Sequence, residues 1–405
     1  MATAEAPRVN TLFEARPSVV WAEALGSNVL DVDGNRYLDA TSGFGAAAVG
    51  HRHPRVAAAV RAQSRRLLHG LADVAAHPAR AALAERLCAL APVSDPRVHF
   101  AVSGSDAVEV ALKTAQLATG RDGILVFEGA YHGVSLGALA ATSRPAFREP
   151  FAAALRPRVV RLPWQCDEDE LTRALDEHGA DLACVLVEPV LGREGVRPAR
   201  PGWLSMLAGH CRAHGLVVAV DEIFTGFGRL GTLFAVAAEG LEPDLLCCGK
   251  ALGGGLPIGA VIGRGDLMAA WDGVGEALHT GTFLAQPLAC AAALAVLDIL
   301  DEEGLVERAA DLGSTIAATL EPLLELGVVT DCRGGGLLWG VELARPAAAT
   351  TAIDHALGAG LLLLTSGPEG RVLEIVPPLV VTEAQLECSL DILSDAVAAA
   401  DSEHE

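Results

Sequence analysis

Residues 182–220 read LACVLVEPVLGREGVRPARPGWLSMLAGHCRAHGLVVAV, and this stretch decides the fold. Two short apolar runs, at 182–187 and 216–220, flank a segment with helical spacing from about residue 202 to residue 213. Apolar runs that alternate with helices are typical of a parallel sheet buried on both faces. The stretch therefore predicts a strand, a helix and a second, parallel strand in an α/β fold.

Further apolar runs at 98–102, 124–127 and 245–248 each lead into a turn that contains glycine. At least five predicted strands thus end in one region, and ligands of open α/β sheets bind beyond the carboxyl ends of such strands. We expect one large domain over residues 51–295. The two chain ends, residues 1–50 and 296–405, are predicted to form a second, smaller α+β domain.

Composition excludes several classes of function. The formal charge of −21 argues against binding of nucleic acid or an anionic membrane, since phosphate groups are held by clustered basic residues. No signal peptide and no apolar run long enough to cross a bilayer is present, so we predict a cytoplasmic protein. Nine cysteines lie scattered without metal-ligand spacing, which favours reduced thiols and no metal site.

Only two of the 30 basic residues are lysines, Lys113 and Lys250. Arginine replaces lysine where only charge is needed, but a guanidinium stays protonated and cannot attack a carbonyl as a neutral amine. A coding bias toward arginine would give the same shortage. The count therefore leaves two candidates for amine chemistry without proving it.

Two residues at predicted strand ends are the main catalytic candidates. Lys250 stands between an apolar run and three glycines, where an apolar pocket would lower its pKa and make the amine nucleophilic. Asp221 ends the run at 216–220, and a buried acid needs a cation such as a protonated pyridine nitrogen. Glu188 is a second acid at a strand end. The alternatives are a surface lysine and an aspartate that caps a turn.

Two further segments favour a planar, phosphorylated ligand. Gly104 and Ser105 in SGSDAVE begin a predicted helix, whose free N–H groups and dipole favour phosphate, although an ordinary capped helix is an equal alternative. Tyr131 and His132 in FEGAYHG follow a predicted strand, where a flat ring could stack on a planar ligand. A core aromatic is the alternative for Tyr131.

Taken in this order, the segments resemble the class III, or ω-amino-acid, aminotransferases of pyridoxal 5'-phosphate (PLP) fold type I. DEIFTGFGRLG at 221–231 and GKALGGGLPIGAV at 249–261 carry the resemblance most specifically. YLDATSGFGAAAVGHRHP, EPVLGREGVRPARPGWL, GTFLAQPLACAAAL, RGGGLLWGVEL and VPPLVVT extend it over nearly the whole chain. The resemblance implies a mainly parallel, seven-stranded sheet flanked by helices, PLP as the cofactor, and a homodimer with shared active sites.

Carried over position by position, the resemblance also implies roles for single residues. Lys250 would hold PLP as a Schiff base and act as the catalytic base, and Asp221 would pair with the pyridine nitrogen. The other implied cofactor contacts are Tyr131 on the ring, Gly104 and Ser105 on the phosphate, Thr282 on the phosphate of the neighbouring subunit, and His132, Glu188 and Phe224 around them. Lys113 is assigned a structural role.

The chain departs from the family members that use glutamate. Those members hold the two carboxylates of glutamate with two arginines, whose positions here are Val134 and Glu374. Arg193 stands where the family has an acid, so it and Glu374 resemble an ion pair with exchanged charges, and we expect them to be close in space. Phe224 replaces a common glutamine, and Phe44 completes the expected substrate contacts. A pair of solvated surface residues is the alternative for Arg193 and Glu374.

These departures predict a donor other than glutamate. We expect an amine, an ω-amino compound or a specialised donor, with a keto acid or another carbonyl compound as acceptor, in a ping-pong reaction. A PLP-dependent lyase, racemase, aminomutase or decarboxylase on the same scaffold is a second hypothesis, because its cofactor segments would look the same. A PLP-binding scaffold protein without activity is a third.

Overall fold

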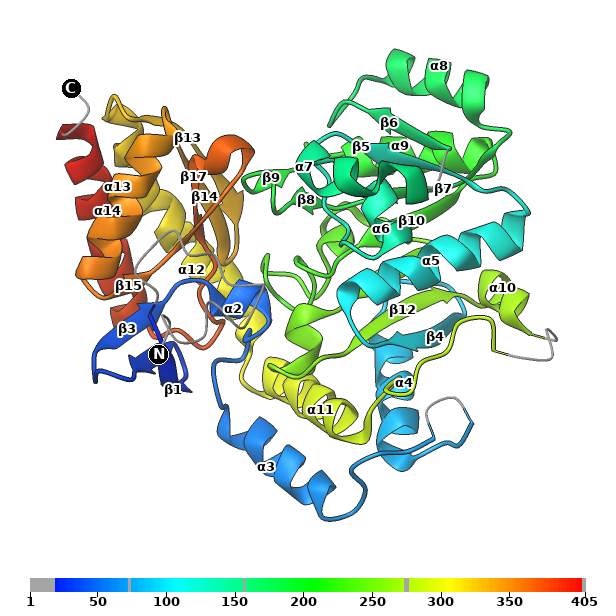
Figure 1. The fold of residues 1–405 in the computed structure, drawn as a ribbon, viewed down its shortest axis with the longest axis horizontal. Helices are drawn as coiled ribbons and strands as arrows, with labels where there is room; N and C mark the ends of the chain where they lie inside the picture. The colour runs from blue at the N-terminus through cyan, green and yellow to red at the C-terminus, as the bar shows by residue number, and fades with distance from the viewer. Residues whose placement is uncertain (1–18, 72–73, 156–157, 273–276, 403–405) are drawn as a thin grey trace.

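A seven-stranded sheet forms the centre of the computed structural model, which describes residues 19–71, 74–155, 158–272 and 277–402 (Figure 1). Its strand order is β4 (Pro96–Ala101), β12 (Gly259–Arg264), β11 (Leu245–Cys248), β10 (Val217–Asp221), β7 (Leu182–Val187), β5 (Gly123–Phe127) and β6 (Val159–Leu162). Only β12 runs antiparallel to its neighbours. The predicted α/β class with a mainly parallel sheet is confirmed.

Helices cover both faces of this sheet. On β10, Val217 and Ala219 pack with α5 (Gly104–Thr119), whereas Val218 and Val220 pack with α9 (Trp203–Ala213). Successive side chains of a strand point to opposite faces, so a strand covered on both sides needs an unbroken apolar run. The remaining helices around the sheet are α3 (Pro54–Ser64), α4 (Pro78–Leu90), α6 (Leu136–Ala141), α7 (Pro145–Arg148), α8 (Glu168–His178), α10 (Gly265–Met268) and α11 (Pro287–Glu302).

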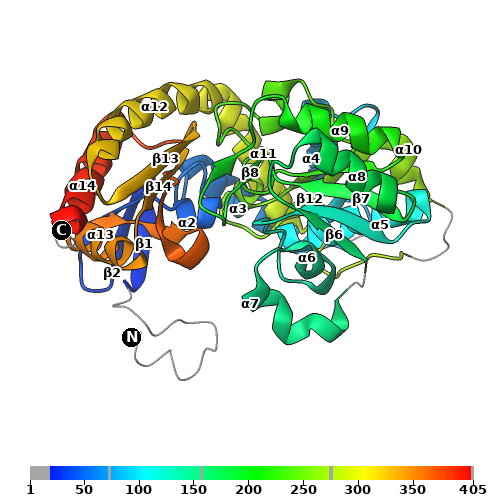
Figure 2. The same ribbon diagram turned by 90° about the horizontal axis from the view of Figure 1, so that it is seen from above.

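Two four-stranded sheets and three long helices form the other part of the molecule (Figures 1 and 2). One sheet has the order β1 (Trp21–Leu25), β2 (Asn28–Asp31), β3 (Arg36–Asp39), β15 (Leu361–Leu362), and the other β13 (Val329–Gly335), β14 (Leu338–Leu343), β17 (Val372–Ile375), β16 (Leu364–Ser366). The helices are α12 (Leu305–Leu320), α13 (Pro346–Gly358) and α14 (Glu383–Ser402). Strands from both chain ends share the first sheet, since β15 lies parallel to β3. The domain borders near residues 50 and 295 stay a prediction.

No described helix is both long enough and apolar enough to cross a bilayer.

Candidate active site

Three neighbouring strands bring the candidate catalytic residues together. Asp221 is the last residue of β10, Glu188 directly follows β7, and Lys250 begins a short 3-10 turn after β11. The parallel register places Val220 opposite Val187 and Asp221 opposite Cys247. The carboxyl ends of the three strands therefore meet at one edge of the sheet, as the sequence predicts.

The amine of Lys250 lies over an aromatic ring. Its Nζ atom is 3.9 Å from the centroid of Phe224, and that ring fits between two glycines. A Cβ atom would lie 2.7 Å from the ring at Gly45 and 2.3 Å from it at Gly192. Burial lowers the pKa of Lys250, and the negative charges of nearby carboxylates, Asp221 first among them, oppose this shift. The surroundings thus favour the neutral, nucleophilic amine.

Asp221 is buried and held by two donors. Its Oδ2 atom lies 2.8 Å from Nδ1 of His132, and its Oδ1 atom accepts the backbone N–H of Ile223 at 3.0 Å. The backbone of His132 is fixed in turn by Thr142, whose hydroxyl accepts its N–H at 2.9 Å. A buried carboxylate with so few partners suits a cationic ligand group.

Glu188 holds the loop that carries Tyr131. Its carboxylate accepts the backbone N–H of Tyr131 at 2.8 Å and that of Gly192 at 3.4 Å. Burial raises the pKa of Glu188 to about 7, while the neighbouring His132 and the two backbone N–H groups oppose the shift. The contacts give this acid a role in positioning two backbone segments beside Asp221.

The start of α5 forms a closely packed cup. The hydroxyl of Ser103 caps the helix by accepting the N–H of Asp106 at 3.2 Å. Ser105 Oγ lies 2.6 Å from Ser135 Oγ, and a Cβ atom at Gly104 would lie 2.8 Å from the Ile223 side chain. Two hydroxyls and free N–H groups at a helix start suit a phosphate.

Arg193 and Glu374 lie near each other without direct contact. The guanidinium of Arg193 lies 5.1 Å from the centre of the Tyr131 ring. Burial raises the pKa of Glu374, and Ser366, Arg193 and Lys250 oppose this shift. No direct ion pair joins Arg193 to Glu374, both of which belong to the described part of the chain. The expected pair with exchanged charges is therefore replaced by an arginine stacked on an aromatic ring and a separate buried acid.

Three other expected site residues are exposed in the single chain. These are Phe44, Val134 and Thr282. Phe44 precedes Gly45, whose Cα lies close to both Phe224 and Lys250. The structure therefore places Phe44 at the rim of the site, and a contact of Thr282 with a phosphate needs a second subunit.

Several residues of the site do not follow from the sequence patterns. Ile223 packs between Gly104 and Gly249, so its side chain borders the cup. Lys113 lies 3.0 Å from Nδ1 of His279, whose Nε2 lies 2.9 Å from Asp106 on the same helix as Lys113. The only signal for Ile223 is its place two residues after Asp221. Contacts such as those of His279 join distant segments and leave no local pattern.

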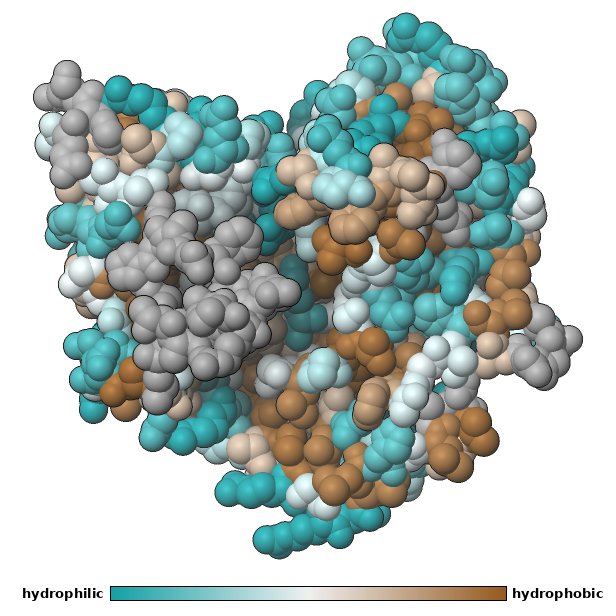
Figure 3. All heavy atoms as spheres, viewed as in Figure 1, coloured by the Kyte–Doolittle hydropathy of each residue, from teal (hydrophilic) through white to brown (hydrophobic). Residues whose placement is uncertain are grey.

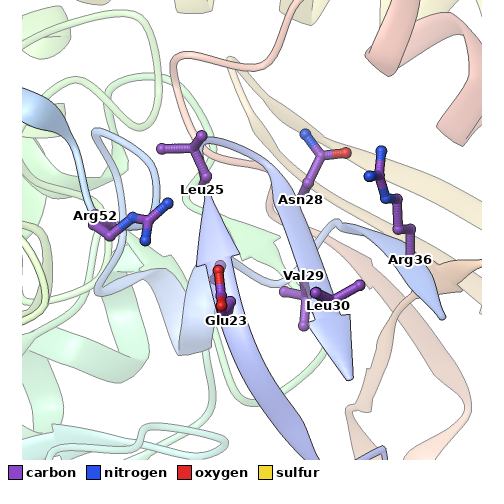
Figure 4. Close-up of a pocket in the computed structure, with 8 residues that line it drawn as sticks. Glu23, Leu25, Asn28, Val29, Leu30, Arg36 and Arg52 are labelled. Carbon is purple, nitrogen blue, oxygen red and sulfur yellow. The ribbon is translucent and has the colours of Figure 1, made fainter. Parts of the chain in front are cut away.

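A separate cavity of about 330 Å³ lies against β1 and β2 (Figure 4). Its charged residues are Glu23, Arg36 and Arg52, and the two arginines lie on either side of these two strands and do not converge on one point. This cavity takes no part in the site at the strand ends.

The arrangement at the strand ends fits PLP. A neutral amine, a buried acid and an anion cup lie at the carboxyl edge of a mainly parallel sheet, and together they define a PLP-dependent enzyme of fold type I. The family model described as "Aminotransferase class-III" matches residues 13–397. The chain therefore belongs to the class III aminotransferases, and PLP is its cofactor.

Three similar proteins illustrate the family. An acetylornithine aminotransferase of Methanosarcina mazei is 35% identical over 381 residues, which cover 94% of this chain and 92% of the relative. A 5-aminovalerate aminotransferase of Pseudomonas aeruginosa is 35% identical over 401 residues, with 93% of each chain covered. A PLP-bound amine transaminase from an uncultivated Pseudomonas species has a TM-score of 0.87 and 31% identity over 98% of each chain.

Proposed function

We propose that this aminotransferase takes its amino group from an amine or an ω-amino compound and passes it to a keto acid or another carbonyl compound. The observation that carries the proposal is Glu374, a buried acid whose charge acts on Lys250. A carboxylate of glutamate would be repelled there. The names of the relatives, which include acetylornithine and 5-aminovalerate, support a donor whose reacting amine stands at the end of an aliphatic chain.

PLP supplies an aldehyde that condenses with amines and a ring that withdraws electrons from the substrate carbon. Lys250 would hold the cofactor, and its amine would serve as the base that takes a proton from the donor carbon; its lowered pKa suits this role. Asp221 would keep a proton on the pyridine nitrogen, and His132 holds the carboxylate in place. Both residues thereby maintain the positive charge that makes the ring an electron acceptor.

Other residues orient the cofactor. Gly104 and Ser105 would hold its phosphate at the start of α5, and Tyr131 would pack against its ring. Glu188 supports Tyr131 through the backbone hydrogen bond at 2.8 Å. Phe224 and the glycines around it shape the pocket of the Lys250 amine and exclude water from it. Excluding water strengthens the electrostatic effect of Asp221.

The enzyme is proposed to act as a homodimer with shared active sites. Large apolar side chains are exposed on two neighbouring segments, residues 67–71 and 283–286. Leu71 is 64% exposed and Phe283 is 63% exposed. Gln286 joins these segments by donating to the backbone of Leu68. Figure 3 shows hydrophobic residues gathered on the lower part of the face that is turned toward the viewer. An apolar patch of this kind suits a second subunit, which would bring Thr282 to the partner's phosphate.

A cytoplasmic location is part of the proposal. All nine cysteines are free thiols, and six of the nine are buried. Free thiols of this kind persist in reducing compartments. Fractionation of cells that express the protein would test the location.

A half-reaction assay tests the proposed function. Purified PLP-bound enzyme is mixed with single amines, ω-amino acids or glutamate, and the formation of pyridoxamine phosphate is followed by absorbance and chromatography. We expect conversion by amines or ω-amino acids and little conversion by glutamate. A preference for glutamate would contradict the assignment based on Val134 and Glu374.

A further inference from the structure

A cavity of about 540 Å³ lies beside the candidate active site. Its walls come from Ser143, Arg144 and Glu194 on one side and from the turn at residues 365–370 on the other. Ligand pockets for small molecules have volumes of this order. Hydroxyls, charged groups and glycine backbone contribute much of its lining, beside apolar parts such as the two prolines.

Arg144 holds the two walls together. Its Nη2 atom donates to the carbonyl oxygen of Gly367 at 3.1 Å and lies 3.7 Å from Oε2 of Glu194. The second distance is too long for a direct hydrogen bond. Gly367 in turn donates its N–H to the carbonyl of Arg193 at 3.0 Å. The cavity is therefore built from the same segment that carries Arg193.

Two buried polar atoms next to this cavity lack well-formed hydrogen bonds. Ser366 lines the cavity and is 7% exposed, and its hydroxyl lies near the Glu374 carboxylate without a well-formed hydrogen bond. Glu374 is 8% exposed, and its Oε1 atom has no partner either. Buried polar atoms are satisfied in most structures, so a buried hydroxyl beside a carboxylate oxygen, neither with a well-formed hydrogen bond, suits a ligand that completes both.

The side chain of Glu374 lies on the face of β17 that packs against the segments around the cavity. Val372 and Glu374 lie on the same face of β17, since they are two residues apart. The side chain of Val372 packs close to Gly195 and Gly367, which belong to the segments around the cavity. Glu374 therefore faces the same side, between the cavity wall at Ser366 and the amine of Lys250.

We propose that Glu374 and Ser366 form a subsite for a second positively charged group of the amino donor. The inference rests on the proposed function and names its substrate class, a diamine or a related polyamine. The ammonium group contacts Glu374 Oε1 and Ser366 Oγ while the reacting amine lies in the pocket of the Lys250 amine, whose place on the cofactor it would take. Polar parts of a larger donor extend into the cavity toward Arg144 and Ser143.

Three donors with five carbons each test the subsite: 1-aminopentane, 1,5-diaminopentane and 5-aminopentanoate, with pyruvate as acceptor. Their distal groups are neutral, cationic and anionic. We expect kcat/KM to be about 10-fold or more higher for the diamine than for the monoamine, as a charged hydrogen bond predicts. The anionic donor should be the slowest. Fastest turnover of 5-aminopentanoate would overturn the proposal and assign the subsite to carboxylates.

Variants and a binding measurement complete the test. Glu374→Gln should bring the rates of the diamine and the monoamine to within about threefold, whereas Glu387→Gln on the exposed face of α14 should keep the preference. Binding of 1,5-diaminopentane, read as a rise in melting temperature, should be lost in Glu374→Gln. The melting temperature tests the subsite separately from the proposed function. An enzyme that turns over no amine would refute the proposed function, and the melting shift with 1,5-diaminopentane would still show whether Glu374 binds the diamine. An equal shift in both variants would overturn the inference.

Discussion

The Nδ1 atom of His132 lies 2.8 Å from the Oδ2 atom of Asp221, and both side chains are buried. The two residues come from different strand ends, since His132 follows β5 and Asp221 ends β10. The histidine fixes the orientation of the acid and stabilises its charge where water cannot. The acid can then hold a proton on a heterocyclic nitrogen.

Replacement of His132 tests this support. His132→Phe removes the donor to Asp221 and should weaken PLP binding by about 10-fold or more, because a hydrogen bond to a buried charge is lost. His132→Asn can keep a donor near the carboxylate and should lose less. Dissociation constants for PLP, measured by fluorescence titration of the apoenzyme, check the order. Equal loss in both variants would assign His132 a packing role only.

Replacement of Lys113 should affect stability and leave the chemistry in place. Lys113→Met removes the contact with His279, worth about 1 kcal/mol, and should lower the melting temperature by roughly 2 °C. Attachment of PLP to Lys250 should be unchanged. Differential scanning fluorimetry and absorbance spectra of the same sample measure the two effects. Loss of the cofactor chromophore in this variant would contradict the structural role.

The buried acid Glu222 makes stability depend on pH. Burial raises its pKa from 4.5 to about 7, so the folded state keeps a proton that the unfolded state has already released. Stability from this group is present below pH 4.5 and is lost as the pH rises to about 7, a change of roughly 3 kcal/mol. Chemical unfolding of the apoenzyme between pH 5 and 8 should show this decline.

Glu222→Gln should flatten that decline, since glutamine does not titrate. At low pH the variant should be less stable, because Thr225, Ala235 and Val236 donate to both oxygens of the Glu222 side chain and glutamine offers only one. The prediction therefore concerns the slope and not the absolute stability. Part of the slope should persist, because Glu188 also has a pKa raised to about 7. Identical slopes in the two proteins would refute the assignment.

The proposed dimer depends on exposed apolar side chains. Phe283→Asp should place a charge in the interface and convert the dimer to monomer at micromolar concentration. Leu324→Asp introduces the same charge at another exposed apolar position, outside the two segments, and should leave the dimer intact. Light scattering after size-exclusion chromatography distinguishes the two states. A wild-type monomer would refute the shared active site.

Much of the large sheet could be predicted from the sequence. Strands buried on both faces have unbroken apolar runs, so β5, β7, β10 and β11 are visible as patterns. Lys250 and Asp221 stand directly at the ends of such runs. Their convergence follows from the parallel topology and needs no distant contact.

Contacts between distant segments could not be predicted from the sequence. Arg193 stacks on Tyr131 instead of pairing with Glu374, a choice that depends on side-chain geometry within the site. The unsatisfied Ser366 likewise depends on the packing of β16 against β17. Patterns in one strand do not report which partner a side chain meets across the fold.

Borohydride reduction of the PLP-bound enzyme, followed by peptide mass spectrometry, tests the central claim most directly. The chain has only two lysines, so the site of attachment is unambiguous. We predict the label on Lys250 in the wild type and in Lys113→Arg, and none on Lys250→Ala. A label on Lys113, or no label on a wild type that has taken up PLP, would contradict the account.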